Sequence, residues 1–301
     1  MMSNRSSATR TLSALLLVVF AGLSGGAAQI APAARPSAPK RVQLYVFDCG
    51  LLNATDEGVQ RYHVTPAEVG ETRMSVPCFL VAHPRGTLVW EVGVIADGVV
   101  TAQPQGIARA NVNATVAAVV TRTLESQLAQ IGYRPADITY VAISHAHIDH
   151  SANLNAFAAS TWLTRPAEHA FMWAENNTRV NPAFYTDLKN SRAVSLDKDE
   201  HDVFGDGTVV LKSAPGHTPG HQVLVLAMRA TGRVMLSGDL YHYPQERTLH
   251  RAPPDNEFNV PQSAASRAMI EDYLQRTKTA LWIEHDFPAN ARLKKSPAYY
   301  E

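Results

Sequence analysis

Hydrophobic and polar positions alternate at the start of the folded part of the chain. From Val42 to Val46 every second residue is aliphatic, a period of two that predicts a strand with one buried face. Two further apolar runs, 78–82 and 87–94, flank His83-Pro84-Arg85-Gly86, which predicts a hairpin. Later runs predict strands at 140–144, 161–164, 208–213, 222–228, 233–236 and 280–284.

Other stretches show the period of a helix. From Thr115 to Ile131 apolar residues recur at spacings of three and four, which predicts an amphipathic helix closed by Gly132. Further helices are predicted near 166–175 and 263–277. Because strands and helices interleave in two similar halves, we expect an α/β fold in which two sheets form a sandwich with helices outside, as one domain over 42–301.

The N-terminus has the order of a secretory signal peptide. Arg5 and Arg10 precede an apolar run over 12–23, and small residues follow at 25–28. We therefore expect a signal peptide over residues 1–28, a Pro/Ala-rich linker over 29–41, and a periplasmic or secreted protein. The apolar run is too short for a membrane anchor, and no later run suffices, so the mature protein is not expected to be membrane-embedded.

Composition narrows the class of protein. Of 301 residues 46% are hydrophobic, enough for a large core, which excludes a disordered chain. Lys+Arg and Asp+Glu both total 27, so no basic excess favours nucleic acid as a partner. An exported protein can form disulfides, and Cys49 and Cys78 are the only cysteines; the sequence leaves their pairing open, as it does the oligomeric state.

The most informative segment follows the predicted strand at 140–144. It reads Ser144-His145-Ala146-His147-Ile148-Asp149-His150, and a chance match to His-x-His-x-Asp-His arises in only about one sequence in a thousand at this composition. Imidazole and carboxylate are ligands that divalent ions such as zinc accept. The segment therefore predicts a metal site.

Three more segments offer ligands at the ends of predicted strands. They contain His217 in Ala214-Pro215-Gly216-His217, Asp239 in Leu236-Ser237-Gly238-Asp239, and His285 in Ile283-Glu284-His285. A lone His or Asp at the end of a strand is weak evidence for a metal ligand. Five His and two Asp together, however, suffice for two ions that share a bridging carboxylate. His221 is left over and is expected to support a ligand or pack its loop.

In these motifs and their order, from His145 to His285, the chain resembles the metallo-β-lactamase superfamily over essentially all of the mature chain. The resemblance implies an αββα sandwich with two divalent ions, by default Zn²⁺, at one edge. It implies that the first ion is held by His145, His147 and His217, the second by Asp149, His150 and His285, and that Asp239 bridges the two.

Within that superfamily, a bridging Asp is typical of lactonases, thioesterases and phosphodiesterases rather than of true β-lactamases. The flanks at 44–50, 77–81 and 214–221 look most like the N-acyl-homoserine lactonase branch. That branch implies a small-molecule substrate with an acyl chain, whose lactone ring is opened by a metal-bridging hydroxide while Asp149 passes a proton to the ring oxygen. Alternatives are another ester, thioester, phosphotriester or β-lactam hydrolase, or a catalytically silent zinc-binding protein.

Two departures from the branch bear on the substrate and on the metal loop. His242 stands three residues after Asp239, where the branch has a tyrosine, so His242 or a neighbouring tyrosine is expected to contact the substrate carbonyl. Glu91 stands where the branch has an aspartate, and either it accepts a hydrogen bond that supports the metal loop or that support differs. Candidates for an acyl groove, more often core at such spacing, are Phe171, Met172, Trp173, Phe184 and Tyr185.

Overall fold

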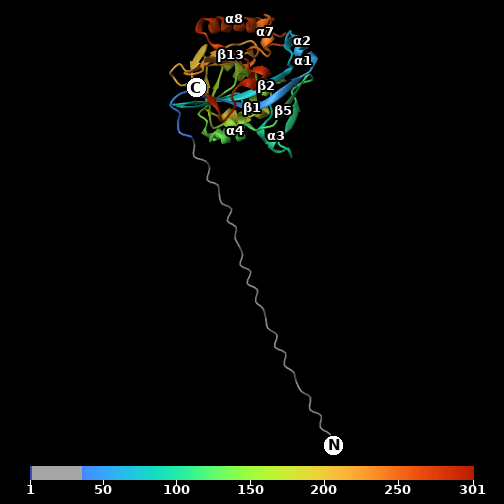
Figure 1. Ribbon diagram of the computed structural model, residues 1–301, viewed down its shortest axis with the longest axis vertical. Coiled ribbons are helices and arrows are strands. Elements are labelled where there is room, and N and C mark those ends of the chain that lie inside the picture. The colour runs from blue at the N-terminus through green and yellow to red at the C-terminus, as the bar shows by residue number, and fades with distance from the viewer. Residues whose placement is uncertain (2–35) are drawn as a thin grey trace. The chain divides into compact units, whose positions relative to one another are not determined.

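Two β-sheets form the centre of the part of the chain that the structure, a computed structural model, describes: Met1 and residues 36–301 (Figure 1). The predicted signal peptide after Met1 and the first part of the predicted linker lie outside the described residues. Residues 36–301 lie in one compact unit. In the described part of the chain, no helix combines the length and the apolar character needed to cross a bilayer.

The first sheet is mixed and has nine strands. In spatial order they are β4 (Ala108–Asn111), β5 (Val116–Val120), β1 (Gln43–Ala54), β2 (Arg73–His83), β3 (Gly86–Trp90), β6 (Tyr140–Ala142), β7 (Thr161–Thr164) and β8 (Ala193–Ser195), with β14 (Tyr299–Tyr300) paired to β1. β2 is central and buried at every residue after its first, as expected for a strand covered on both faces. A disulfide joins Cys49 on β1 to Cys78 on β2.

The second sheet has five strands and carries most of the later motifs. Its order is β13 (Ala280–Trp282), β12 (Gly232–Leu236), β11 (Gln222–Met228), β10 (Val209–Ser213) and β9 (Glu200–Asp202). β12 and β13 run parallel, so their carboxyl ends meet at the same edge.

Helices lie on the outer faces of both sheets. They are α1 (Asp56–Gln60), α2 (Pro66–Val69), α3 (Asp97–Thr101), α4 (Leu124–Gln130), α5 (Ile148–Ser151), α6 (Pro166–Met172), α7 (Pro244–Thr248), α8 (Val260–Thr277) and α9 (Phe287–Arg292). In Figure 1, α8 lies beyond β13 on one side of the molecule, and α3 and α4 lie on the other. Short 3₁₀ turns occupy Pro135–Asp137, Leu154–Phe157, Pro182–Phe184, Thr186–Asn190 and Gly238–Leu240.

Three apolar clusters hold these layers together. The cluster between the sheets packs β1, β2 and β3 against β10, β11 and β12, with Trp90 and Leu224 fully buried. A larger cluster covers the outer face of the first sheet. A third lies under α8, where Ile270 and Leu274 meet Val225. This order of helix, sheet, sheet and helix is the expected αββα sandwich.

One predicted element is wrong in its first half. Val116 to Val120, taken as the start of a helix, form strand β5, whose buried residues alternate and which pairs with both β1 and β4. The helix begins only after Thr123, whose side chain caps it by accepting from Ser126 N. β-branched valines fit a pleated surface better than a helix, and pairing with two neighbouring strands decides the outcome.

Candidate metal centre

The His-x-His-x-Asp-His segment leaves the end of β6 and turns directly into α5. Ser144 N donates to Glu91 Oε1 (2.9 Å) and Ala146 N donates to Glu168 Oε1 (2.7 Å), so two buried carboxylates fix the backbone on each side of His145. Ser151 Oγ donates to the carbonyl of His147 (2.8 Å), which closes the turn. The side chains of this segment are therefore held on a rigid loop.

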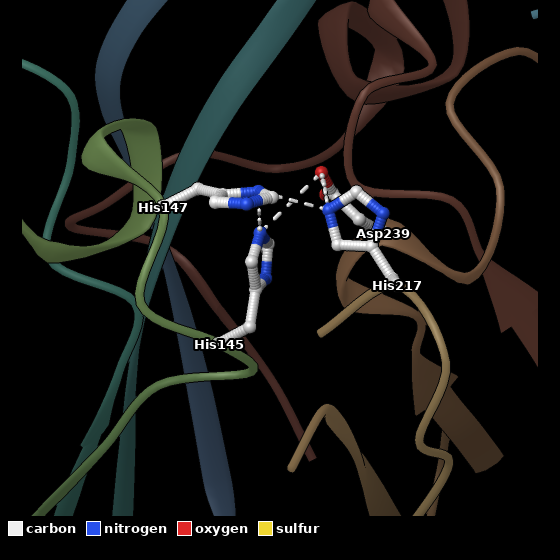
Figure 2. Close-up of side chains that lie close together, drawn as sticks. All are labelled: His145, His147, His217 and Asp239. Carbon is white, nitrogen blue, oxygen red and sulfur yellow. Dashed lines mark hydrogen bonds and ion pairs between the residues drawn. The ribbon is translucent and has the colours of Figure 1, made fainter. Parts of the chain in front are cut away.

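Three imidazoles converge with one oxygen of Asp239, as Figure 2 shows. His147 Nδ1 lies 2.9 Å from His145 Nε2 and 3.0 Å from His217 Nε2. Asp239 Oδ2 lies 3.3 Å from His217 Nε2 and 3.6 Å from His145 Nε2. His217 comes from the loop between β10 and β11, and Asp239 from the turn after β12, so segments far apart in sequence supply this cluster.

The other oxygen of Asp239 belongs to a second cluster. Asp239 Oδ1 lies 3.0 Å from His285 Nε2 and 3.1 Å from His150 Nε2. Asp149 Oδ2 lies 3.6 Å from His285 Nε2 and 3.7 Å from His150 Nε2. All seven residues selected from the sequence are thus brought together, and Asp239 presents one oxygen to each group.

The buried polar atoms of this site fit a pair of metal ions. His150 Nε2 and Asp239 Oδ1 are buried, and neither has a properly oriented hydrogen-bond partner among the described residues. Such an atom is costly to bury unless something satisfies it. Imidazole nitrogens and carboxylate oxygens aimed at common points are the donor set of a divalent ion, so the residues present can hold two.

The charges of the site depend on one another. Burial alone would raise the pKa of Asp239, but the imidazoles of His150, His285 and His242 outweigh it and hold the pKa well below its usual value. Burial opposes protonation of His217, yet Glu257 and Asp239 raise the pKa of its imidazole to about 10. Without a cation the site therefore favours protons on His150 and His217, whereas burial lowers the pKa of His145 and His147 well below the usual value. Metal cations can take the place of those protons when they bind.

Most of the ligand imidazoles are oriented through their other nitrogen. His150 Nδ1 lies 3.1 Å from Glu91 Oε2, and His217 Nδ1 lies 3.1 Å from Glu257 Oε2. His285 Nδ1 donates to the carbonyl of Ser75 (2.8 Å). Such partners fix the ring orientation and strengthen the ligand. Glu91 thus lies where a supporting acceptor was expected.

His221 lies behind the site and contacts Asp239 through the backbone. Burial lowers the pKa of its imidazole to about 3, so the ring is neutral. Nδ1 donates to the carbonyl of Ala214 (2.9 Å), which leaves Nε2 to accept from Asp239 N (3.0 Å). His221 therefore holds the turn that carries Asp239.

His242 also lies against Asp239. Its Nε2 is 3.1 Å from Asp239 Oδ2, and its Nδ1 is 3.6 Å from Glu246 Oε2. Burial opposes its charged form, but Asp239 and Glu246 raise the pKa of His242 to about 9. Carboxylates therefore face both ring nitrogens.

A cavity of about 300 Å³ opens onto these side chains. Its lining includes five of the seven converging residues, along with Tyr62, His242, Arg61 and Arg179, and an apolar wall of Leu52, Met74, Val112, Val116 and Ile148. The proposed groove residues do not line it. Phe171, Met172 and Tyr185 are core residues, Trp173 and Phe184 pack against the same core, and the Tyr185 hydroxyl donates to the carbonyl of Met172.

Three residues of the site escaped sequence reasoning: Tyr62, Glu168 and Glu257. None belongs to a histidine motif, and each reaches the site only through the fold. Glu257 carried no signal in the sequence, and Glu168 stands in the first turn of the helix predicted near 166–175, where acidic residues are common.

Comparisons with known proteins agree with this geometry. A family model described as the metallo-beta-lactamase superfamily matches residues 72–273. N-acyl homoserine lactonase AttM of Azorhizobium caulinodans is 27% identical over 268 residues, covering 86% of this chain and 99% of that protein. AttM of Agrobacterium fabrum is 25% identical over 270 residues, covering 86% and 98%.

Solved structures share the fold. An N-acyl homoserine lactone hydrolase with the product N-hexanoyl-L-homoserine bound at its catalytic metal centre superposes with a TM-score of 0.70 at 21% identity, covering 85% of this chain and 98% of that one. AidC, a dizinc quorum-quenching lactonase, gives a TM-score of 0.60 at 18% identity, covering 86% and 93%.

Proposed function

Because the chain belongs to the metallo-beta-lactamase superfamily, we propose that it is a metal-dependent hydrolase that opens the ring of N-acyl homoserine lactones. The observation that carries the proposal is Asp239, which gives one oxygen to each ligand cluster. Relatives named N-acyl homoserine lactonase align over nearly their whole length, which supports the substrate class.

Two zinc ions are the cofactor we propose. His145, His147 and His217 would hold one, Asp149, His150 and His285 the other, and Asp239 both. When bound, a pair of such ions lowers the pKa of a water molecule and polarises a carbonyl oxygen. Zinc suits this set because every donor is an imidazole or a carboxylate.

The chain's own residues complete the proposed reaction. A water oxygen bonds to the lactone carbonyl carbon, and the bond from that carbon to the ring oxygen breaks. Asp149, which lines the cavity, accepts a proton from the water and passes it to the departing ring oxygen. His242 holds the Asp239 carboxylate in place at 3.1 Å, and the apolar wall of Leu52 and Met74 receives the acyl chain.

Export to the periplasm or the medium is the location we propose. The basic, apolar and small-residue order of residues 1–28 supports it, and so does the Cys49–Cys78 bond, because disulfides persist in oxidising compartments. Mass measurement of the protein from the periplasmic fraction tests this. We expect an N-terminus near residue 29; a full-length chain confined to the cytoplasm would overturn it.

The activity is tested with the zinc-loaded protein and N-hexanoyl homoserine lactone at controlled pH, by following acid release. We expect ring opening well above the spontaneous rate and its loss after chelation. A thioester, a phosphotriester and a β-lactam measured beside the lactone separate this activity from others on the same fold. Faster turnover of any of these would replace the lactone as substrate.

A further inference from the structure

Tyr62 lies in the turn after α1 and lines the cavity beside the converging side chains. Its backbone N donates to the carbonyl of Val59 (3.0 Å), and His63, with φ of 58°, redirects the chain immediately afterwards. The ring of Tyr62 packs on the imidazole of His242 with centroids 4.1 Å apart. A residue with no place in any motif is thus fixed against the centre of the site.

The tyrosines and the imidazole that follow Asp239 in the sequence already face polar groups of the protein. The Tyr243 hydroxyl donates to the carbonyl of Thr72 (2.7 Å), and the Tyr241 hydroxyl donates to Glu271 (3.2 Å). Neither tyrosine lines the cavity. The two nitrogens of His242 face Asp239 and Glu246.

Tyr62 differs from all of these. It is the one tyrosine among the described residues that line the cavity, and its hydroxyl has no hydrogen-bond partner in the described part of the chain. Burial, followed by the charges of Asp239 and Tyr243, raises the pKa of its phenol well above the usual value, so the group is a neutral donor. A fixed donor of this kind needs no reorganisation when charge develops on a substrate oxygen.

We infer that Tyr62 is a catalytic residue whose hydroxyl donates a hydrogen bond to the carbonyl oxygen of the substrate as that oxygen gains charge. The inference rests on the proposed lactonase function. It assigns to a residue of the first 70 positions the contact that the sequence led us to expect from His242 or a neighbouring tyrosine. His242 then acts as a positioning residue, because its ring supports that of Tyr62 and its Nε2 contacts Asp239.

The test compares Tyr62→Phe with Tyr243→Phe in the zinc-loaded protein. Each variant loses one hydroxyl and keeps its ring, and Tyr243 packs edge-on against Tyr62 without lining the cavity. Measured for each are kcat and KM with N-hexanoyl homoserine lactone, zinc content, and the affinity for the ring-opened product by calorimetry. Loss of one such donor lowers kcat by about 10²-fold.

We expect Tyr62→Phe to lower kcat by about that factor with zinc content unchanged and KM within about threefold of wild type, because the contact strengthens in the transition state. Tyr243→Phe is expected to keep kcat within about twofold. If kcat is unchanged in Tyr62→Phe, or falls equally in both variants, the role assigned to Tyr62 is overturned while the proposed function stands. No lactone turnover by the wild type overturns the proposed function and this inference with it.

Discussion

Glu168 on α6 joins the two loops that carry the ligands of the first cluster. Its Oε1 accepts from Ala146 N (2.7 Å), between His145 and His147. Its Oε2 accepts from Thr218 Oγ1 (2.7 Å) and Gly220 N (3.0 Å), in the loop of His217. The loop passes so close that a Cβ at Gly220 would collide with the backbone of Glu168. Replacing this carboxylate tests whether the site depends on it.

The magnitude follows from the three hydrogen bonds. Glu168 is buried, and each hydrogen bond to a charged group contributes about 1.5–3 kcal/mol. Glu168→Gln keeps one acceptor oxygen but turns an amide donor towards the N–H of Gly220. Because this substitution removes or weakens two of the three hydrogen bonds, we expect the free energy of unfolding to fall by about 3 kcal/mol. Zinc affinity should fall by roughly 10- to 100-fold, as for other residues that orient ligands.

Urea unfolding and zinc competition with a chelator measure these two quantities. Glu175→Gln, an exposed position shortly after α6, makes the same charge change away from the loops and serves as the control. It should leave both values near wild type. If Glu168→Gln unfolds within about 0.5 kcal/mol of wild type and binds zinc equally well, Glu168 does not hold the loops together, and the reasoning is refuted.

Three further changes test other parts of the fold. Cys49→Ser with Cys78→Ser opens a loop of sequence separation 29 and should lower the unfolding free energy by about 3.5 kcal/mol in urea, whereas no change would show that the bond does not form. Glu246→Gln leaves buried Arg267 (2.8 Å away) without a charged partner and should cost about 3–5 kcal/mol; a loss under about 1 kcal/mol would contradict that pairing. Burial lowers the pKa of Lys295 to about 8, so between pH 8 and about 10.5 the unfolded state binds more protons than the folded state. The free energy of unfolding, measured relative to that of Lys295→Met, should therefore rise with pH across that window. A difference that does not change with pH would contradict the pKa shift.

Contiguous patterns predicted the frame of the site well. The strand that forms β6 and the His-x-His-x-Asp-His turn after it could be predicted because all of their residues lie close together in the sequence. Asp239 and His285 were selected because each follows a predicted strand, and β12 and β13 do end beside one another. Once those strands pair, the bridging geometry follows from their shared edge.

The sequence pattern could not show features that depend on contacts between residues far apart in the chain. Val116 to Val120 have apolar spacings that fit a helix, and only β1 and β4 on either side make them a strand. Glu168 and Glu257 are ordinary acidic residues until folding buries them against the ligand loops. Tyr62 reaches the cavity from more than 80 positions before the first histidine ligand, and no spacing rule connects the two.

Metal stoichiometry with activity tests the central claim most directly. Elemental analysis of the purified mature protein and of Asp239→Asn, each followed by the lactone assay, asks whether one carboxylate serves two ions. We predict two zinc ions per wild-type chain, and in Asp239→Asn the loss both of at least one ion and of ring opening. A single ion in a fully active wild type, or two ions and full activity in Asp239→Asn, would contradict the account.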